Sequence, residues 1–440
     1  MVTKNQYFFF WVFVFLIITN CSFDTKSGIW TGDKKIVEEK EVFIRIDEES
    51  KIIKEEINSK LIINIKEGSL NKNWFFSDVN LKNNIPHLLF NGSLKNISKF
   101  KFKKSANFEF YSPEILLSEK YIIFYDNNGF LVKYNSNKEI LWKTRISNKK
   151  QQKSITSISL ALLENIIYGS DNLGKYFALD LNTGKLKWEK KHINFFNSQI
   201  KVKNKKIFLV DIDDNLICLS TIDGNLLWHF ETESSLIKTT KKASIIISEK
   251  YAVFVNSRGT LSKLNLDTGY LVWQLQTQNT LINNETNFLK NSELVYSNNE
   301  LFLSNNKNGF YSIDFKTGTI NWKQKINSSI RPIILDSLVL TINDDGYLIA
   351  IDANNGNIVR ATYLLDKFNK RKKKKLLFES FVVASKKAYI TTNRGYILIC
   401  SISNGKVDKI FRLGNSKLSQ PFVANNRLYI VKNNSISVLN

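Results

Sequence analysis

The chain is poor in the residues that most often carry chemistry. Its 440 residues include only three histidines and three cysteines. His87, His192 and His229 form neither an HExxH motif nor a closely spaced ligand pair, so nothing indicates a zinc site. Walker, GxGxxG and GxSxG motifs are also missing. We therefore expect no catalytic residues, no metal and no cofactor.

Other scarce residues exclude further classes of protein. Four prolines and 18 glycines are too few for a collagen-like or low-complexity chain. Cys218 and Cys400 lie far apart in strand-like runs, so we expect two buried free thiols and no disulfide. Hydrophobic residues make up 43% of the chain, which is enough for a core. At this length a single domain has to be a barrel or a repeat array.

Acidic residues are outnumbered by basic ones, 40 to 63, which gives a formal net charge of +23. The surplus is spread along the chain, which is typical of a lysine-rich composition and not of a nucleic-acid interface. One run of six basic residues stands out, at positions 370–375 in "FNKRKKKKLLF". We expect a solvated loop there. Contact with anionic head groups or an acidic partner is the alternative.

The one long apolar run lies at residues 7–19, "YFFFWVFVFLIIT". With Lys4 before it, this run is typical of a secretory signal and is too short for a stable membrane span. It ends near Cys21, which resembles the lipidated cysteine of bacterial lipoproteins. We expect a signal peptide at residues 1–20, lipidation at Cys21 and a flexible, charged tether over residues 21–72. The alternative is an ordinary signal peptide with an incidental cysteine.

A motif recurs along the rest of the chain. "LDLNTGKLKW" at residues 179–188 is echoed by "LSTIDGNLLW" and "LNLDTGYLVW". These three copies have a polar turn, a glycine and a tryptophan four residues later, and two late copies of the motif are degenerate. The copies end at Trp142, Trp188, Trp228, Trp273, Trp322, Arg360 and Lys409. The tryptophans are 46, 40, 45 and 49 residues apart, a period that indicates a solenoid or a propeller.

Within each repeat the apolar residues alternate, and glycine-containing turns separate the runs. Such units of about forty residues predict four-stranded antiparallel blades of an all-β propeller. We expect the five tryptophans to pack across the seams between blades, with each indole N–H on a polar partner. Seven repeats are complete, and an eighth stops at Asn440 without its last strand. Residues 93–105 offer that strand, so we expect eight blades over residues 73–440, closed by an N-terminal strand.

The "LDxxTGxxxW" core resembles the PQQ-type propeller repeat. With Cys21 and "NWFFSDVN" at residues 73–80, the whole chain resembles the BamB family of outer-membrane lipoproteins, in its alphaproteobacterial form. The resemblance implies a non-enzymatic scaffold of the outer-membrane β-barrel assembly (Bam) complex. Such a protein is anchored by its lipid at the periplasmic face of the outer membrane. Its implied partners are BamA, the other Bam subunits and unfolded outer-membrane protein precursors.

The longest interval between tryptophans contains the segment "QTQNTLINNETNFLKNSEL", residues 276–294. In the BamB family the corresponding loop region docks on BamA. The resemblance therefore implies Phe288 and Leu289 as apolar contacts and Lys290 as a polar rim residue. The alternative is a solvated loop that folds back on its own blade.

Two other functions share this kind of repeat. PQQ-dependent periplasmic dehydrogenases are also eight-bladed propellers, but they need a vicinal cysteine pair and calcium-binding carboxylates, and neither pattern is present here. A propeller adaptor of another envelope complex is the third hypothesis, because scaffolding leaves no catalytic signature.

Overall fold

The computed structural model describes residue 53 and residues 55–76, 80–104, 114–155, 157–233, 241–277, 289–307 and 309–440. The predicted signal peptide, Cys21 and the predicted tether up to residue 52 lie outside these ranges. Ser50–Asn440 is one compact unit. Within the described ranges, no helix has both the length and the apolar character needed to span a bilayer.

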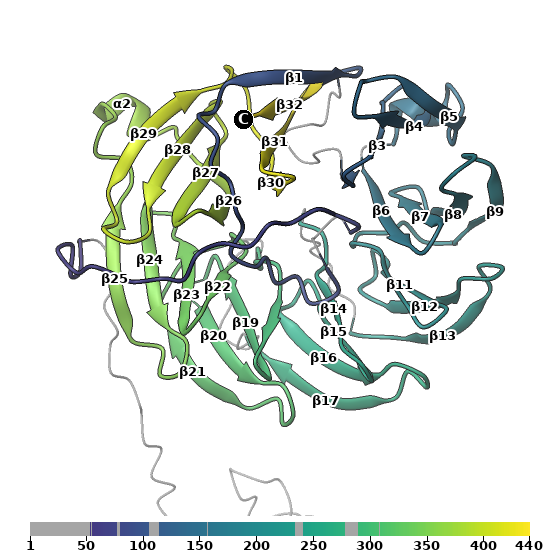
Figure 1. Ribbon diagram of the computed structural model, residues 1–440. Helices are drawn as coiled ribbons and strands as arrows, with labels where there is room; N and C mark the ends of the chain where they lie inside the picture. Colours follow the sequence, from purple (N-terminus) through teal and green to yellow (C-terminus); the bar gives the residue numbers. More distant parts are fainter. Residues whose placement is uncertain are drawn as a thin grey trace, which may run out of the picture. The chain divides into compact units, whose positions relative to one another are not determined.

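Eight four-stranded antiparallel sheets form a ring, so the fold is an eight-bladed β-propeller (Figure 1). This confirms the fold predicted from the repeat. In blades 1 to 7 the strands run in chain order, with the first strand of each blade nearest the centre and the fourth at the rim. The described ranges contain two short helical elements, the 3-10 turn η1 (Gln151–Lys153) and α2 (Lys370–Lys373).

The blades are numbered here from β2. Blades 1 and 2 consist of β2 (Ile115–Leu117), β3 (Tyr121–Tyr125), β4 (Phe130–Asn135), β5 (Ile140–Arg145), β6 (Ile158–Leu163), β7 (Ile166–Asp171), β8 (Lys175–Asp180) and β9 (Leu186–Lys191). Blades 3 and 4 consist of β10 (Lys201–Lys203), β11 (Lys206–Val210), β12 (Leu216–Ser220), β13 (Leu226–Phe230), β14 (Ile245–Ile247), β15 (Tyr251–Val255), β16 (Thr260–Asn265) and β17 (Leu271–Gln276).

Blades 5 and 6 consist of β18 (Val295–Ser297), β19 (Glu300–Asn305), β20 (Gly309–Asp314), β21 (Ile320–Gln324), β22 (Ile333–Leu335), β23 (Leu338–Ile342), β24 (Tyr347–Asp352) and β25 (Ile358–Tyr363). Blades 7 and 8 consist of β26 (Phe378–Ala384), β27 (Lys387–Thr392), β28 (Tyr396–Ser401), β29 (Val407–Arg412), β30 (Pro421–Ala424), β31 (Arg427–Lys432), β32 (Ser435–Leu439) and β1 (Asn96–Lys101).

The hydrophobic core is divided among the seams between neighbouring blades. At the seam of blades 3 and 4, for example, Phe208 and Cys218 pack with Ile245, Phe254 and Leu264, and all five side chains are buried. The two middle strands of a blade are apolar on both faces because each face meets a neighbouring blade. Each buried phenylalanine contributes about 2 kcal/mol by removal from water. Stability therefore depends on contacts between blades and not on any blade alone.

The tryptophans of the repeat lie at these seams, on the fourth strand of each blade. Four of the five indole N–H groups donate to a backbone carbonyl of the next blade, so each ties one blade to the next. The pairs are Trp142 to Leu181 O (2.9 Å), Trp188 to Thr221 O (3.1 Å), Trp273 to Phe315 O (3.2 Å) and Trp322 to Ala353 O (2.7 Å). The expected partner is missing only at Trp228, whose buried Nε1 has no hydrogen bond among the described residues, so this indole holds its seam by packing alone.

In blades 2 to 6 the glycine of the motif lies against the tryptophan of the preceding blade. A Cβ atom on Gly184 would come within 2.7 Å of the Trp142 ring, and one on Gly356 within 2.6 Å of the Trp322 ring. Both glycines also have positive φ, +68° and +76°, a conformation that other residues adopt only with strain. The turn, the glycine and the tryptophan therefore recur together because the first two form the surface on which the third packs.

Arg360 takes the place of the tryptophan at the seam between blades 6 and 7. Its side chain is buried, and its guanidinium donates to Ile402 O, to Ser403 O (2.7 Å) and to Leu61 O (3.1 Å). Gly405 lies beneath the guanidinium: a Cβ atom on this glycine would come within 3.0 Å of Arg360 Nε. The planar guanidinium thus replaces the indole as a flat donor group on the glycine, and it also binds the N-terminal segment.

Blade 8 joins the two ends of the propeller. β1 pairs with β32 in antiparallel register, with Lys99 opposite Ser437 and Phe100 opposite Ile436. This confirms that an N-terminal strand completes the last blade. Phe100 is buried, and its ring lies 5.5 Å from that of Tyr134 in blade 1, so β1 also forms the seam to the first blade.

Residues 55–72, the described end of the expected tether, pack on the ring, and so do residues 73–76 and 80–91 that follow. Figure 1 shows this segment crossing from the rim beside β25 to the centre. Ile63 and Ile65 are buried in the cluster of blades 6 and 7. Trp74 is fully buried and pairs with Leu117 of β2 through both backbone hydrogen bonds. Several branched apolar residues within this charged stretch, such as Ile63 and Ile65, explain the difference from the expected flexible tether, because they are buried in a seam between blades.

Candidate functional site

The acidic residues of the repeat serve the hairpin turns between the second and third strands. In Asp171 and Asp211, one carboxylate oxygen accepts the backbone N–H groups two and four residues later, at 2.9–3.0 Å. Asn256 and Asn305 do the same at the equivalent positions. These are Asx turns, so turn geometry accounts for the acids. The described residues contain no group of three or more His, Cys, Asp or Glu that could hold a metal ion.

A buried lysine binds the N-terminal segment at the centre of the ring. Lys201 of β10 is fully buried, and its Nζ donates to Asn80 O (2.7 Å) and Asn83 Oδ1 (2.5 Å). The Asn83 amide in turn donates to Ile245 O (3.1 Å) and Leu294 O (3.0 Å) of blades 4 and 5. An unpaired ammonium costs several kcal/mol when buried, so these acceptors fix the path of residues 80–84.

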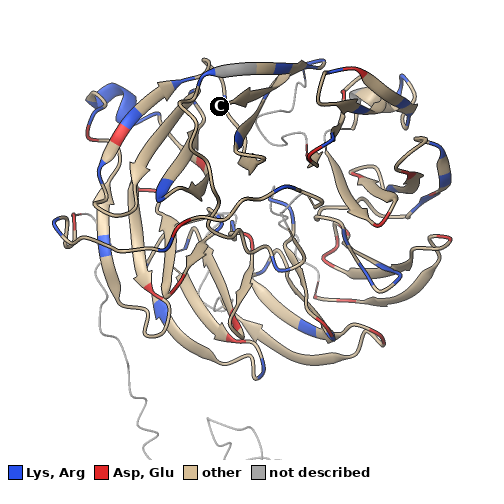
Figure 2. Ribbon diagram, viewed as in Figure 1, with Lys and Arg blue, Asp and Glu red and all other residues tan. Residues whose placement is uncertain are grey.

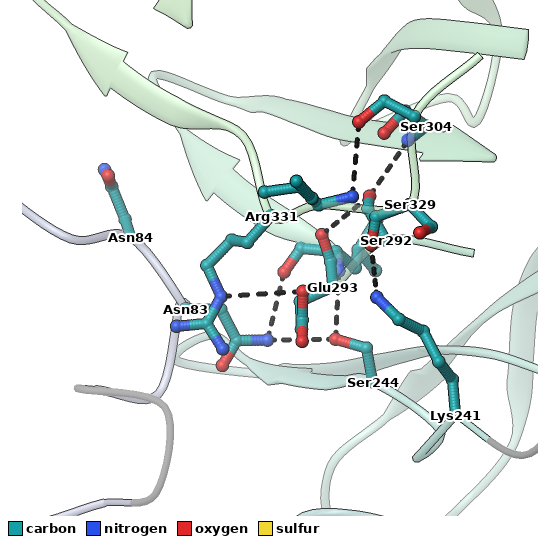
Figure 3. Close-up of polar contacts among 12 residues, drawn as sticks. Asn83, Asn84, Lys241, Ser244, Ser292, Glu293, Ser304, Ser329 and Arg331 are labelled. Carbon is teal, nitrogen blue, oxygen red and sulfur yellow. Dashed lines mark hydrogen bonds and ion pairs between the residues drawn. The ribbon is translucent and has the colours of Figure 1, made fainter. Parts of the chain in front are cut away.

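Glu293 is the acidic residue of a second central group (Figure 3). Arg331 Nε lies 4.0 Å from Glu293 Oε2, and Lys241 Nζ donates to the Ser329 carbonyl nearby. Burial of the Glu293 carboxyl works to raise its pKa, but Lys241, Arg331 and a backbone hydrogen bond act in the opposite direction, and the net effect is a lowered pKa. Glu293 is therefore ionised and held as a counter-ion, which suits a structural role and not that of a general acid.

A third polar group connects blades 1, 2 and 4. Glu114, just before β2, accepts from Lys242 Nζ, from Ser159 Oγ (3.1 Å) and from Leu160 N (3.0 Å). Lys242 also donates to Ser159 Oγ (2.9 Å). As in the other two groups, the described polar side chains at the centre bind one another and the backbone.

These residues do not fit a quinone cofactor with calcium. The two described thiols lie in blades 3 and 7, both are buried, and burial raises the pKa of each to about 12. They cannot form the adjacent pair that the dehydrogenases require. The central carboxylates Glu114 and Glu293 are each engaged by lysine or arginine, and the described part of the chain holds no cluster of acidic oxygen ligands.

Of the residues predicted to bind a partner, Phe288 lies outside the described ranges. Leu289 is half-buried and Lys290 is exposed, just before β18. The backbone of Lys290 is bound to Asn306, with Lys290 N to Asn306 Oδ1 at 2.7 Å and Asn306 N to Lys290 O at 3.1 Å. The structure thus places Leu289 and Lys290 at the connection between blades 4 and 5, fixed against the hairpin of β19 and β20.

A second exposed surface was not predicted from the sequence. Six large apolar side chains lie on the outer edge of blades 3 and 4, in and just before β13 and β17, each 47–77% exposed. They are Ile222, Leu226, Leu227, Tyr270, Leu271 and Val272. We call these six residues the apolar rim. Strands β13 and β17 contain no Asp, Glu, Lys or Arg, and this gap in an otherwise charged series of outer strands is the sequence signal that could have revealed the rim.

Known proteins are similar to this chain mainly in the region of the repeats. A family model described as outer membrane protein assembly factor BamB matches residues 127–362. Outer membrane protein assembly factor BamB of Moranella endobia is 23% identical over 195 residues, 44% of this chain. The matched region spans 50% of that relative's own length.

Solved structures show the same fold. The crystal structure of BamB from Moraxella catarrhalis superposes with a TM-score of 0.66 at 15% identity and covers 79% of this chain and 99% of that one. A europium-containing methanol dehydrogenase superposes with a TM-score of 0.65 at 12% identity, covering 82% and 89%. At such identities the likeness concerns the architecture alone, and it is shared by an assembly factor and an enzyme.

Proposed function

Because the chain belongs to the family of outer membrane protein assembly factor BamB, we propose that it is a non-enzymatic scaffold subunit of the outer-membrane β-barrel assembly complex. The observation that carries this proposal is the match of the family model to residues 127–362, which include most of blades 1 to 6. The polar groups at the ring centre support the non-enzymatic part, since the described ones are used in binding the N-terminal segment and the blades.

The scaffold acts by rigid presentation. Seams sealed by tryptophan hold the blades in fixed relative positions, so the connections between blades are displayed at fixed distances. Leu289 and Lys290 lie on one such connection, and we assign BamA to this position. Lipidation of Cys21 after removal of residues 1–20 anchors the protein at the periplasmic face of the outer membrane.

The test is recovery of BamA with the tagged protein from its own detergent-solubilised envelope. Leu289→Asp places a charge at the proposed contact and is expected to reduce BamA recovery by about tenfold. The matched control is Ile193→Asp, which changes an 89% exposed apolar residue in the connection between blades 2 and 3. Recovery with both variants would keep the assembly role and discard the Leu289 contact. Absence of BamA from the wild-type sample would overturn the role.

A quinoprotein is the second candidate, favoured by the architecture shared with the methanol dehydrogenase. Purified protein that carries a quinone would show visible absorbance and would release an acidic chromophore on denaturation. We expect neither, because the described residues supply neither the adjacent thiols nor the calcium ligands. A stoichiometric chromophore would reverse this assignment.

A further inference from the structure

The connection between blades 6 and 7 carries the densest run of like charge in the sequence. Residues 366–377 include seven basic side chains and one acidic side chain. Six of the basic residues are consecutive, at positions 370–375, and we call these six residues the basic turn. They form α2 and the two residues after it, and Figure 2 shows α2 in the colour of Lys and Arg. Lys373 is half-buried, and the other five side chains are exposed.

The basic turn is held in place at both ends. Phe368 before it and Leu376 after it are buried in the cluster of blades 6 and 7. The Asn393 side chain accepts from Leu377 N (2.9 Å) and donates to Lys375 O (3.2 Å). The charged side chains are therefore presented from a fixed backbone on a rigid scaffold.

The described residues do not neutralise the charge of the basic turn. Within the described ranges it makes one ion pair, Lys373 Nζ to Asp366 Oδ1 at 3.8 Å, and the Asp366 side chain is 88% exposed. An exposed pair of this kind contributes little. The preceding residues 21–52 do not supply the missing charge, since they include eight acidic and six basic residues. An anionic surface would therefore relieve the mutual repulsion of the neighbouring cations.

The N-terminal segment joins the ring beside the basic turn. Ile53 is buried in the cluster of blades 5 and 6. Glu56 Oε1 accepts from the backbone N–H of Tyr363 (3.1 Å), and Lys373 Nζ lies 5.0 Å from the centre of the Tyr363 ring. Tyr363, at the end of β25, thus contacts both the N-terminal segment and the basic turn. The chain that leads from Cys21 reaches the propeller in the same sector as the basic turn.

A membrane surface suits these two features together. A basic cluster beside the attachment point of a lipid-anchored segment is the second signal that stable membrane contact uses. The five exposed cations are spread over the surface of the turn, so a layer of lipid phosphates can meet them together, whereas one small anion cannot. Leu377, 60% exposed directly after the turn, adds an apolar side chain for the boundary between head groups and acyl chains.

We propose that the basic turn binds the phosphate head groups of an anionic phospholipid bilayer and turns the edge of blades 6 and 7 toward the membrane that holds the anchor. Each basic residue near such a surface strengthens attachment severalfold, and salt screens the effect. Head-group binding stands on the charge and position of the basic turn alone. The orientation rests on the proposed function, because it uses the anchor at Cys21.

The test measures sedimentation of the protein with phospholipid vesicles. The chain used is residues 21–440 with Cys21→Ser, so that neither a lipid nor the first 20 residues hold it, and Ser50–Asn440 is one compact unit that remains whole. We expect binding to vesicles of phosphatidylcholine with phosphatidylglycerol and none to phosphatidylcholine alone. Binding should be lost in about 1 M salt, where the screening length falls to about 3 Å. Failure to bind the anionic vesicles, or equal binding to both kinds, would overturn the proposal.

A matched pair of variants separates the basic turn from the net charge of the protein. The first neutralises three exposed residues of the turn and leaves Lys373 on Tyr363; its changes are Arg371→Gln, Lys374→Gln and Lys375→Gln. We expect binding at least about tenfold weaker. The control removes three exposed lysines from blade 2, which lies across the ring from blade 6; its changes are Lys185→Gln, Lys187→Gln and Lys191→Gln. Binding should stay within about twofold, and equal weakening by both variants would overturn the proposal.

The orientation is tested with an environment-sensitive dye on a single introduced cysteine. Cys218 and Cys400 are buried, so an exposed cysteine is labelled selectively in the Cys21→Ser chain. Leu377→Cys places the dye beside the basic turn, and Leu186→Cys places it at a 48% exposed position on blade 2. Anionic vesicles should shift the emission to the blue at position 377 and not at position 186. An equal shift at both positions would overturn the orientation.

The same preparations keep the two proposals apart. Vesicle binding that depends on the basic turn, in a protein that recovers no BamA, would retain the membrane contact while the assembly role fails. BamA recovery by a protein that does not bind anionic vesicles would retain the assembly role and overturn the membrane contact.

Discussion

Gly356 and Trp322 illustrate how single residues hold neighbouring blades together. The glycine has φ of +76°, and a Cβ atom there would lie 2.6 Å from the Trp322 ring. The indole N–H binds Ala353 O three residues before the glycine. One seam thus combines a turn that requires glycine, an aromatic surface packed on that turn and a hydrogen bond across the seam.

Gly356→Ala should destabilise the protein by about 2 kcal/mol or more, because it combines an unfavourable φ with overlap against the indole. The measurement is the free energy of unfolding in urea. Gly414→Ala is the matched control, since its φ is not positive and its nearest neighbour would be the flexible end of Lys432 at 3.4 Å. An unchanged stability for Gly356→Ala would show that the indole moves away at no cost.

The sequence was informative about seam residues where they repeat and silent where they do not. The motif itself marks the five tryptophans and their glycines. It identifies Arg360 only as a departure, although the structure gives this residue three carbonyl partners. The pairing of Lys201 with Asn83 was not foreseen, because the two residues are more than a hundred positions apart and belong to no period. Polar contacts of this kind depend on the closed ring, which no local pattern contains.

At the level of elements, the segment at residues 55–76 was the least predictable part. Its composition is charged, which favours a solvated tether, yet isoleucines at intervals enter the seams of blades 6 and 7. Ile63 is 6% exposed and donates its backbone N–H to Ser403 O at 2.8 Å, whereas its neighbour Ile62 is 59% exposed. Alternation over so few residues could not be distinguished from chance.

This pair of neighbours offers a direct test of whether the segment is bound. Ile63→Asp should cost about 3 kcal/mol at that contact and detach the segment, because a carboxylate would be buried among apolar side chains. Ile62→Asp should change little, about 0.5 kcal/mol at most. The measurement is the rate of tryptic cleavage at Lys60 in the native protein. Similar rates in both variants would mean that the segment leaves the ring without the mutation.

For the whole molecule, ring closure was the part best predicted from sequence. The sequence contains seven complete repeats and an eighth that lacks its last strand, which predicts that an N-terminal strand completes the last blade. In the structure β1 pairs with β32 in that blade. The count works because a propeller with an unpaired edge strand would be incomplete. What the count could not supply is the path from the tether to β1, which the N-terminal segment takes over the centre of the ring.

A disulfide across this closure should stabilise the entire propeller. Lys99→Cys with Ser437→Cys, in a chain with Cys21→Ser, joins residues that face each other in β1 and β32. In the chain-entropy model a loop of this length is worth about 6 kcal/mol. Thermal unfolding with and without reductant measures the gain, and the reduced protein is its own control. Equal midpoints would indicate that unfolding begins elsewhere than at blade 8.

The pairing of β1 with β32 also sets an order of events during synthesis. Among the strands that the structure describes, β1 is synthesised first and β32 last, so the seven blades between them can form on the nascent chain before β1 finds its partner. A chain that stops a few residues early leaves β1 without its partner and β31 with a bare edge. Truncated copies would therefore display two open edges to proteases and to each other. Blade 8 therefore conceals both edges only once β32 has been made and has paired with β1.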